Sequence, residues 1–297
     1  MRIAITGSSG LVGSALVRAL EGDGHTAVRV VRSGAGADTV RWDIDRGDID
    51  TAGLEGLDGV VHLAGEGIAD KRWTDDQKRK IRESRSKGTT LLADALAGLT
   101  DKPPVLVSGS AIGFYGDRGD EQLTESSAAG SGFLTEVVEA WEGAAVPAVA
   151  AGIRVAYLRT GIVLDADGGV LDRLVALARF GLLGKLGSGQ QWMSWVALAD
   201  EVGAIRFLLD HDVAGPVNVT APGPVTNEVF TKALGRVLKR PTFLPIPSFG
   251  PKLLLGSELA DSLLFQGQRV LPEVLLDAGY DFEHPDLEPA LRAILDR

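Results

Sequence analysis

The first half of the chain alternates between two hydrophobic patterns. Short apolar runs, of the kind buried in parallel strands, are separated by stretches whose apolar residues recur at helical spacing. The first run, residues 3–5, is followed by a helical stripe that starts at Leu11. Further runs predict strands at residues 26–31, 39–42, 60–65, 105–110 and 154–159, and stripes predict helices at residues 72–97 and 133–141. This alternation predicts an α/β fold with a doubly wound parallel sheet and right-handed crossovers.

Beyond Val163 the pattern is less regular. It predicts helices at residues 171–180, 200–209, 253–264 and 286–295, a strand at 217–220, a glycine-rich loop at 181–189, an aromatic extended segment at 190–196 and a proline-punctuated stretch at 222–251. We expect a nucleotide-binding sheet domain formed by residues 1–164, to which residues 196–220 return. Residues 165–195 and 221–297 are expected to form a smaller, substrate-covering domain.

A glycine-rich turn joins the first predicted strand to the first predicted helix, in the sequence Thr6-Gly-Ser-Ser-Gly-Leu-Val-Gly13. Gly7 allows a sharp turn, Gly10 lets the backbone approach a pyrophosphate, and Gly13 lets the helix lie close to the sheet. The helix N-terminus directs free N–H groups and a positive dipole end at the same loop. The turn therefore predicts a dinucleotide site, although a tight turn without a ligand has the same glycines. The expected contacts in this segment are Thr6, Gly7, Ser9, Gly10, Leu11, Val12 and Gly13.

The end of the second predicted strand indicates which dinucleotide is bound. An acidic residue about 20 positions after the glycine motif binds the ribose of NAD, whereas an arginine accommodates the 2′-phosphate of NADP. Arg32 and Ser33 occupy this position. We therefore expect NADP(H), with a solvated arginine at a strand end as the alternative interpretation. Other residues expected to line the cofactor are Asp43, at the adenine, and Leu63, Ala64, Gly65, Arg85 and Ser108.

Composition excludes several classes of site. The 297 residues carry a net charge of −10 that is spread along the chain, which argues against a nucleic-acid partner. There is no cysteine, and the four histidines show no metal-ligand spacing, so we expect neither a thiolate nor a metal site. His62 lies within an apolar run and is expected to be a packed core residue. No run approaches the roughly 20 apolar residues of a membrane span, and the cytosol is the expected compartment.

Together these motifs resemble the extended short-chain dehydrogenase/reductase superfamily. The resemblance rests on the glycine turn and on three further strings, Leu63-Ala-Gly65, Ser108-Gly-Ser110 with Tyr115-Gly116, and Arg159-Thr-Gly161. Four more strings resemble an atypical, nucleoside-diphosphate-sugar epimerase-like branch: Ile68-Ala-Asp-Lys-Arg-Trp-Thr74, Glu83-Ser-Arg85 with Gly88-Thr89, Trp192-Met-Ser-Trp195 and Gly267-Gln-Arg-Val-Leu-Pro272. The resemblance implies an NADP-binding Rossmann domain, a small C-terminal domain and an undefined reaction.

The chain departs from that superfamily at its catalytic pair. Active members use a tyrosine and a lysine four residues later, because the lysine lowers the pKa of the phenol. The three tyrosines here are Tyr115, Tyr157 and Tyr280, and none has a lysine four residues on. The atypical branch is likewise known for lacking this pair.

Other residues could take part in chemistry. By the resemblance, Ser110 stands where the superfamily has its catalytic hydroxyl, and Tyr115 follows it as either a substrate contact or a packing residue. With no cation expected beside it, Tyr115 should keep a pKa near ~10. Arg72, Arg154 and Arg159 are candidate anion binders, of which Arg159 is the best placed; Trp192 and Trp195 are expected to pack, with ring stacking as the alternative.

We expect an NADP(H)-dependent epimerase or oxidoreductase with a small-molecule substrate. A non-catalytic NADPH-binding regulatory protein is the rival interpretation. The sequence does not indicate an oligomeric state.

Overall fold

The computed structural model describes residues 1–34, 36–242 and 245–296. The main strands are β1 (Arg2–Thr6), β2 (Thr26–Val31), β3 (Thr39–Asp43), β4 (Asp48–Ile49), β5 (Gly59–His62), β6 (Val105–Ala111), β8 (Arg154–Thr160) and β12 (Gly215–Val219). Short strands are β7 (Gln122–Leu123), β9 (Ile162–Asp165), β10 (Trp192–Met193), β11 (Trp195–Ala197), β13 (Val225–Thr226) and β14 (Arg269–Val270).

Helices connect and cover these strands. They are α1 (Leu11–Gly22), α2 (Asp75–Gly98), α3 (Phe133–Gly143), α4 (Val146–Ala150), α5 (Gly169–Arg179), α6 (Leu198–Asp210), α7 (Asn227–Leu238), α8 (Phe249–Leu255), α9 (Ser257–Ala260), α10 (Glu273–Asp277) and α11 (Leu287–Ile294). Three further helical turns are η1 (Ala52–Leu54), η2 (Ile112–Tyr115) and η3 (Asp261–Phe265). None of the helices in the described ranges is both long and apolar enough to cross a membrane.

The main sheet has eight strands in the order β12-β8-β6-β5-β1-β2-β3-β4. All neighbours in it are parallel except β3 and β4, which form a short antiparallel edge. The order reverses between β1 and β5, and open α/β sheets bind ligands at such a switch point, beyond the carboxyl ends of the strands. The predicted doubly wound Rossmann fold is confirmed.

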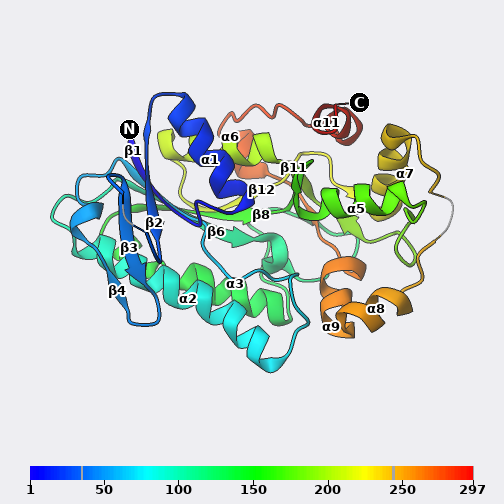
Figure 1. Cartoon of the computed structure of the whole chain (residues 1–297), viewed down its shortest axis with the longest axis horizontal. Helices are drawn as coiled ribbons and strands as arrows, with labels where there is room; N and C mark the ends of the chain where they lie inside the picture. Colours follow the sequence, from blue (N-terminus) through cyan, green and yellow to red (C-terminus); the bar gives the residue numbers. More distant parts are fainter. Residues whose placement is uncertain (35, 243–244, 297) are drawn as a thin grey trace.

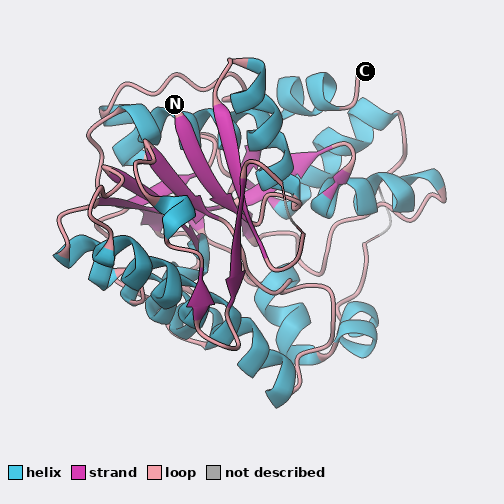
Figure 2. Cartoon of the chain, turned by 60° about the vertical axis from the view of Figure 1, so that its left-hand side comes forward, coloured by secondary structure: helices cyan, strands magenta, loops and turns pink. Residues whose placement is uncertain are grey.

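Two helical layers cover this sheet. Figure 1 shows α1 and α6 on one face and the long α2 with α3 on the other, and Figure 2 shows the twisted strands between them. The central strands are buried on both sides, as β5 illustrates with four buried residues. Because parallel strands under two helical layers need apolar side chains on both faces, these strands read as continuous apolar runs in the sequence.

The second half of the chain adds its own apolar cluster. Helices α5, α7 and α11 pack around Trp195 and Phe230, which are 0% and 1% exposed. The strand β12 and helix α6 rejoin the main sheet and its α1 layer. The division between the two expected domains stays a prediction.

The sequence interpretation missed helix α7, which lies inside the stretch described as punctuated by prolines. Its buried Phe230, Ala233, Leu234 and Val237 do recur at helical spacing, but prolines bound the segment on both sides. The helix expected at residues 253–264 is broken instead, because Gly256 has φ +91° and separates α8 from α9. The other predicted strands and helices are present within a few residues of their expected bounds.

Candidate cofactor and reaction site

The glycine turn brings three elements together at the switch point. Gly7 has φ +68°, and a Cβ added there would lie 2.8 Å from the carbonyl carbon of Leu63, after β5. A Cβ added at Gly13 would lie 2.2 Å from the carbonyl oxygen of Gly7. Glycine is therefore required at both positions, at the first for its backbone angle and at both for close packing. The N–H of Gly10 donates to the Gly7 carbonyl at 2.9 Å and closes the turn.

Thr6 holds the neighbouring segment through its hydroxyl. The Thr6 Oγ1 accepts the backbone N–H groups of Leu63 at 3.0 Å and Ala64 at 3.1 Å. It therefore donates its own proton to Nδ1 of His62, 2.7 Å away. The His62 ring is fully buried, and burial, together with the nearby Arg85 charge, lowers its pKa to about 4. His62 is a neutral core residue, as expected, and it positions the 63–65 segment.

Arg85 places a positive charge beside that segment. Its guanidinium carbon lies 3.2 Å from where a Cβ on Gly65 would stand. Its Nη1 donates to the carbonyl oxygens of Glu66 at 2.9 Å and Ile81 at 3.1 Å, and the guanidinium lies 4.9 Å from the Trp141 ring centre. Burial lowers the pKa of Arg85 to about 10, and within the described ranges no carboxylate forms an ion pair with it. The Glu66 carboxylate acts on Arg85 only from beyond ion-pair distance, so this half-buried cation is left to attract a further anion here.

The residues predicted to select the cofactor follow β2 and β3. Arg32 and Ser33 are exposed directly after β2, and no acidic side chain in the described part of the chain pairs with Arg32. Asp43 ends β3, and its Oδ1 accepts the N–H groups of Asp45 and Arg46, both at 3.1 Å. Asp43 therefore caps its own turn while its carboxylate stays partly exposed. Ser108 is fully buried within β6, where it is the register partner of His62.

A buried polar network occupies the carboxyl ends of β6 and β8. Ser110 and Arg159 are register partners on these strands, and both meet Glu142 of helix α3. The Ser110 hydroxyl donates to Oε1 of Glu142 at 2.6 Å. Arg159 binds the same carboxylate with two groups, Nε to Oε1 at 2.8 Å and Nη2 to Oε2 at 2.9 Å. The Arg159 and Glu142 side chains are 4% and 15% exposed, so this bidentate ion pair is largely shielded from water.

Tyr115 lies behind this network and is fully buried. Its hydroxyl donates to Oδ1 of Asn218 at 2.7 Å and accepts from Nη1 of Arg159 at 3.1 Å. The expectation that no cation stands beside Tyr115 is wrong, because the neighbouring strand supplies Arg159. Burial nevertheless raises the pKa of the Tyr115 phenol, which outweighs the effect of the arginine. The structure thus favours the packing interpretation of this residue.

A second buried carboxylate lies on the opposite face of β8. Thr160, the residue after Arg159, donates its hydroxyl to Oε1 of Glu201 on α6 at 2.8 Å. Glu201 is 1% exposed, and its Oε2 has no hydrogen-bond partner among the described residues. Burial without a cation raises the pKa of Glu201 to about 8. Neither Glu142 nor Glu201 was singled out from the sequence.

The candidate anion binders have other partners. The expectation that Arg159 is the best placed of them is wrong, since Glu142 neutralises its charge. Arg154 donates to the carbonyls of Leu208 at 2.8 Å and Val213 at 3.0 Å, which fastens α6 to β8. Arg72 donates to the carbonyl of Leu253. These contacts are structural because backbone carbonyls would otherwise lose their partners.

The two tryptophans differ in their surroundings. Trp195 is fully buried and donates to the Gly223 carbonyl at 3.1 Å, so it packs as expected. Trp192 is partly exposed, donates to Asp120 at 2.8 Å, and has the Arg269 guanidinium 4.4 Å from its ring centre.

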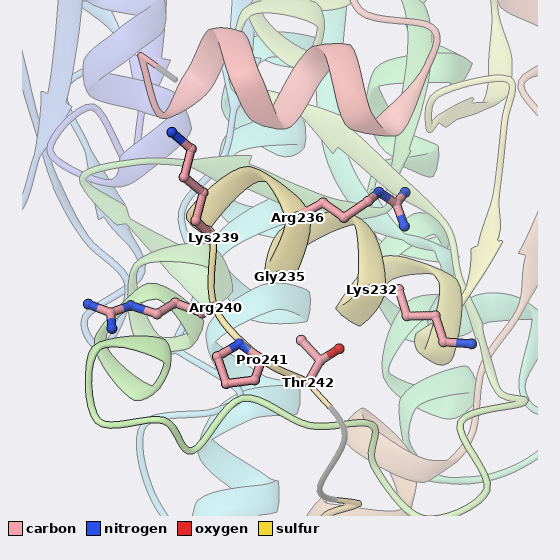
Figure 3. A pocket seen from close by; sticks show the side chains of 7 residues that line it. All are labelled: Lys232, Gly235, Arg236, Lys239, Arg240, Pro241 and Thr242. Carbon is pink, nitrogen blue, oxygen red and sulfur yellow. The ribbon is translucent and has the colours of Figure 1, made fainter.

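Figure 3 shows a surface depression elsewhere, at the end of α7. Four basic side chains and Gly235, Pro241 and Thr242 line it, and none of the predicted site residues does. Two of the basic residues are already paired, Lys232 with Glu228 at 2.7 Å and Arg236 with Glu288 at 2.6 Å. Cations near the C-terminus of a helix are stabilised by its dipole, which accounts for their presence here. Across the described ranges no group of acidic and histidine side chains could hold a metal ion.

Comparisons with known proteins identify the family and agree with the fold. Residues 3–220 match the model of the NAD dependent epimerase/dehydratase family, and residues 246–294 match a domain of unknown function. An epimerase family protein of Mycobacterium leprae is 42% identical over 97% of this chain and 94% of its own length. A crystal structure of human epimerase family protein SDR39U1 with NADPH superposes with a TM-score of 0.91 at 30% identity, covering 100% of both chains. A nucleoside-diphosphate sugar epimerase from Corynebacterium glutamicum gives a TM-score of 0.82 at 38% identity, covering 99% of this chain and 58% of that one.

Proposed function

The chain belongs to the NAD-dependent epimerase/dehydratase family, as an atypical member of the extended short-chain dehydrogenase/reductase type, and from this we propose that it is an NADP(H)-dependent oxidoreductase or epimerase. A nicotinamide dinucleotide is the cofactor class of this family. The finer assignment to NADP(H) is ours. The observation that carries it is the arrangement of two cations, Arg85 and Arg32, along the same carboxyl edge as the glycine turn.

The cradle fits a dinucleotide on physical grounds. A Cβ at Gly7 or Gly13 would fill the space that the turn leaves between β1, β5 and α1. We propose that the backbone of this turn and Arg85 hold the pyrophosphate, because both offer donors and positive potential to an anion. The NADPH bound to the human relative agrees with a phosphate-bearing ligand of this kind.

The two ends of the cofactor would lie on different strands. We propose that Arg32 and Ser33 receive the 2′-phosphate after β2 and that Asp43 lies at the adenine. The remaining predicted contacts, which would line the path between them, are Ser9, Leu11, Val12, Leu63, Ala64 and Gly65. Ser108 was also predicted as a contact, but it is 0% exposed and would support this path rather than touch the cofactor. Thr6 is 0% exposed, so we propose that it does not touch the cofactor and instead positions the backbone of Leu63 and Ala64.

The reacting end would lie at the carboxyl ends of β6 and β8. The cofactor, when bound, supplies hydride exchange at its nicotinamide ring. Ser110 is the proposed substrate contact, since it stands at the carboxyl end of β6, is 5% exposed where Tyr115 is 0% exposed, and has its hydroxyl oriented by Glu142 at 2.6 Å. Tyr115 is proposed to hold Arg159 and Asn218 in place rather than to touch the substrate, because it is fully buried.

Binding measurements on purified protein test the choice of cofactor. Arg32→Ala should weaken NADPH binding by about 10-fold and leave NADH binding unchanged, because an exposed arginine–phosphate contact contributes at the low end of the about 1.5–3 kcal/mol found for charged hydrogen bonds. Arg18, exposed on α1, provides the matched control Arg18→Ala. Equal affinities for NADPH and NADH in the native protein, or an unchanged NADPH affinity in Arg32→Ala, would overturn the assignment.

A non-catalytic NADPH-binding role is the second candidate. Two observations favour it: the polar groups at the reacting end are bonded to one another, and no lysine stands four residues after Tyr115. The two candidates are separated by following NADPH oxidation against carbonyl compounds and nucleotide sugars. Turnover that disappears in Ser110→Ala excludes the regulatory role. Tight NADPH binding with no turnover on any compound supports it. The cytosol stays the expected compartment from the sequence.

A further inference from the structure

The hydrogen bonds around Ser110 have a fixed direction. A guanidinium can only donate, so the Tyr115 oxygen accepts from Arg159 at 3.1 Å and must give its own proton to Asn218, 2.7 Å away. The Asn218 amide is consistent with this, because its Nδ2 donates to the carbonyl of Leu271 at 2.9 Å. Among Tyr115, Asn218 and Arg159, only Arg159 therefore has protons left to donate to Glu142.

The hydrogen bonds between Glu142 and Ser110 also have a fixed direction. The Glu142 carboxylate receives two donors from Arg159 and the hydroxyl proton of Ser110 at 2.6 Å. Both oxygens of Glu142 thus face donors, in an ion pair with the always-charged Arg159, and a carboxylate in such a pair only accepts. Ser110 has one proton, and it is committed to Glu142. The oxygen of Ser110 therefore has only lone pairs to offer to another group.

We propose that Ser110 accepts a hydrogen bond from the substrate hydroxyl and relays that proton to Glu142, so that the site takes an alcohol for oxidation. This inference rests on the proposed NADP(H)-dependent function. It gives α3 a proton acceptor although the helix carries no tyrosine–lysine pair. A carbonyl oxygen is excluded as the preferred partner of Ser110, because two acceptors would face each other.

The proposed step balances in atoms and electrons. The alcohol carbon gives a hydride to NADP⁺, which is reduced to NADPH, and the alcohol is oxidised to a carbonyl compound. The substrate O–H bond breaks as its proton moves to Oγ of Ser110, and the original Ser110 proton moves to Oε1 of Glu142. Arg159 stays bound through Nη2 to Oε2, so the ion-pair partner holds its position while Oε1 takes up the proton. The reverse sequence reduces a carbonyl.

The surroundings of Glu142 contain few other titrating groups. Arg159 and Tyr157 face it from β8, and burial, with a smaller contribution from the Glu142 charge, raises the pKa of Tyr157. Tyr115 is separated from Glu142 by Arg159, and its own pKa is raised by burial. In the described part of the chain the shortest proton route from Ser110 therefore ends at Glu142.

Steady-state kinetics test the relay. A panel of secondary alcohols and nucleotide sugars is offered with NADP⁺, and the formation of NADPH is followed as a function of pH. Glu142→Gln should lower kcat by about 100-fold or more, the usual contribution of a positioned proton acceptor, and should leave KM within a few-fold. Glu142→Asp should restore part of kcat and shift the midpoint of the pH profile, which a purely structural contact would not do.

A second measurement does not depend on turnover or on a variant that folds poorly. Neutron diffraction from a deuterium-exchanged crystal of the native protein with NADPH locates the proton between Ser110 and Glu142. We expect the deuterium on Oγ of Ser110.

A third test is kinetic. Ser110→Ala removes the first relay atom without touching the ion pair, and it should reduce kcat as strongly as Glu142→Gln with NADPH affinity unchanged.

The outcomes separate the relay from the proposed function. Native-like turnover in a folded Glu142→Gln or Ser110→Ala protein overturns the relay while the oxidoreductase function stands. A deuterium on Glu142 overturns the relay whatever the kinetics show, because Ser110 would then be free to donate. Absence of turnover in the native protein with every compound overturns the proposed function and, with it, the relay.

Discussion

Glu201 gives the sharpest test of how burial sets charge in this protein. It is 1% exposed, its Oε1 accepts from Thr160 at 2.8 Å, and no basic side chain forms an ion pair with it in the described ranges. Burial raises the pKa of this carboxyl from 4.5 to about 8. The folded chain therefore holds a proton at neutral pH that the unfolded chain has released.

The magnitude follows from linkage. One pKa unit of difference between folded and unfolded states corresponds to about 1.4 kcal/mol, so full ionisation of Glu201 in the folded chain costs on the order of 5 kcal/mol. Because the folded state binds the extra proton, the free energy of unfolding falls as pH rises from about 4.5 to about 8. The loss is complete above about pH 8, where the folded chain also releases the proton.

The perturbation is Glu201→Gln, which keeps an oxygen for Thr160 and cannot ionise. Urea unfolding of both proteins at a series of pH values from 5 to 9 gives the difference in their free energies of unfolding. We expect the free energy of unfolding of the variant, relative to that of the native protein, to increase by up to about 1.4 kcal/mol per pH unit until about pH 8. Above that pH the difference should stay constant. Asp94→Asn, at an exposed position of α2, is the control, and its free energy of unfolding should change with pH as that of the native protein does. A difference between native and Glu201→Gln proteins that stays flat from pH 5 to 9 refutes the reasoning.

Two further predictions concern the glycine turn and Tyr115. Gly13→Ala should destabilise the fold by about 1–3 kcal/mol and weaken NADPH binding, because its Cβ would stand 2.2 Å from the Gly7 carbonyl oxygen; thermal unfolding and an NADPH titration measure both effects. Gly22→Ala, with nothing within 4 Å of the added Cβ, is its control, and equal behaviour of the two variants would contradict the packing argument. Tyr115→Phe should cost about 1–3 kcal/mol in urea unfolding, because it leaves Oδ1 of buried Asn218 without its donor. Its NADPH affinity should match that of the native protein, and a selective loss of affinity with unchanged stability would mean that Tyr115 reaches the ligand.

The fold could be predicted from the sequence where local pattern and burial coincide. Strands buried on both faces must be apolar throughout, so the run at residues 105–110 identifies β6 without knowledge of its neighbours. The glycine turn is also largely local, since the φ of Gly7 and the contact of Gly13 with the Gly7 carbonyl are set within one strand, turn and helix, although Gly7 also packs on Leu63 after β5. Helix α7 was missed because flanking prolines dominated the interpretation of a segment whose apolar stripe faces a distant cluster.

The polar network could not be predicted in the same way. Ser110 and Glu142 are 32 positions apart in sequence, and Glu142 and Arg159 are 17 apart. They meet because β6 and β8 pair with Ser110 opposite Arg159, a register that no local pattern specifies. The same register places a cation beside Tyr115 and removes Arg159 from the set of free anion binders. Interpretation of single residues fails here because each charge is set by a partner on another element.

Consecutive residues of β8 lead to two carboxylates in opposite states. Arg159 points toward α3 and holds Glu142 as an ion pair, whereas Thr160 points toward α6 and offers Glu201 a single neutral donor. The strand end thus lies between a carboxylate in an ion pair and one that burial keeps protonated up to about pH 8. Above that pH the second carboxylate carries a charge within the same edge of the sheet, and the loss of stability that began near pH 4.5 is complete. Ionisation of Glu201 near pH 8 is thus a second source, besides the Ser110–Glu142 relay, of a decline of turnover in alkaline solution. Measuring the pH profile of turnover in the Glu201→Gln protein separates the two, because only the relay retains its ionising group in that variant.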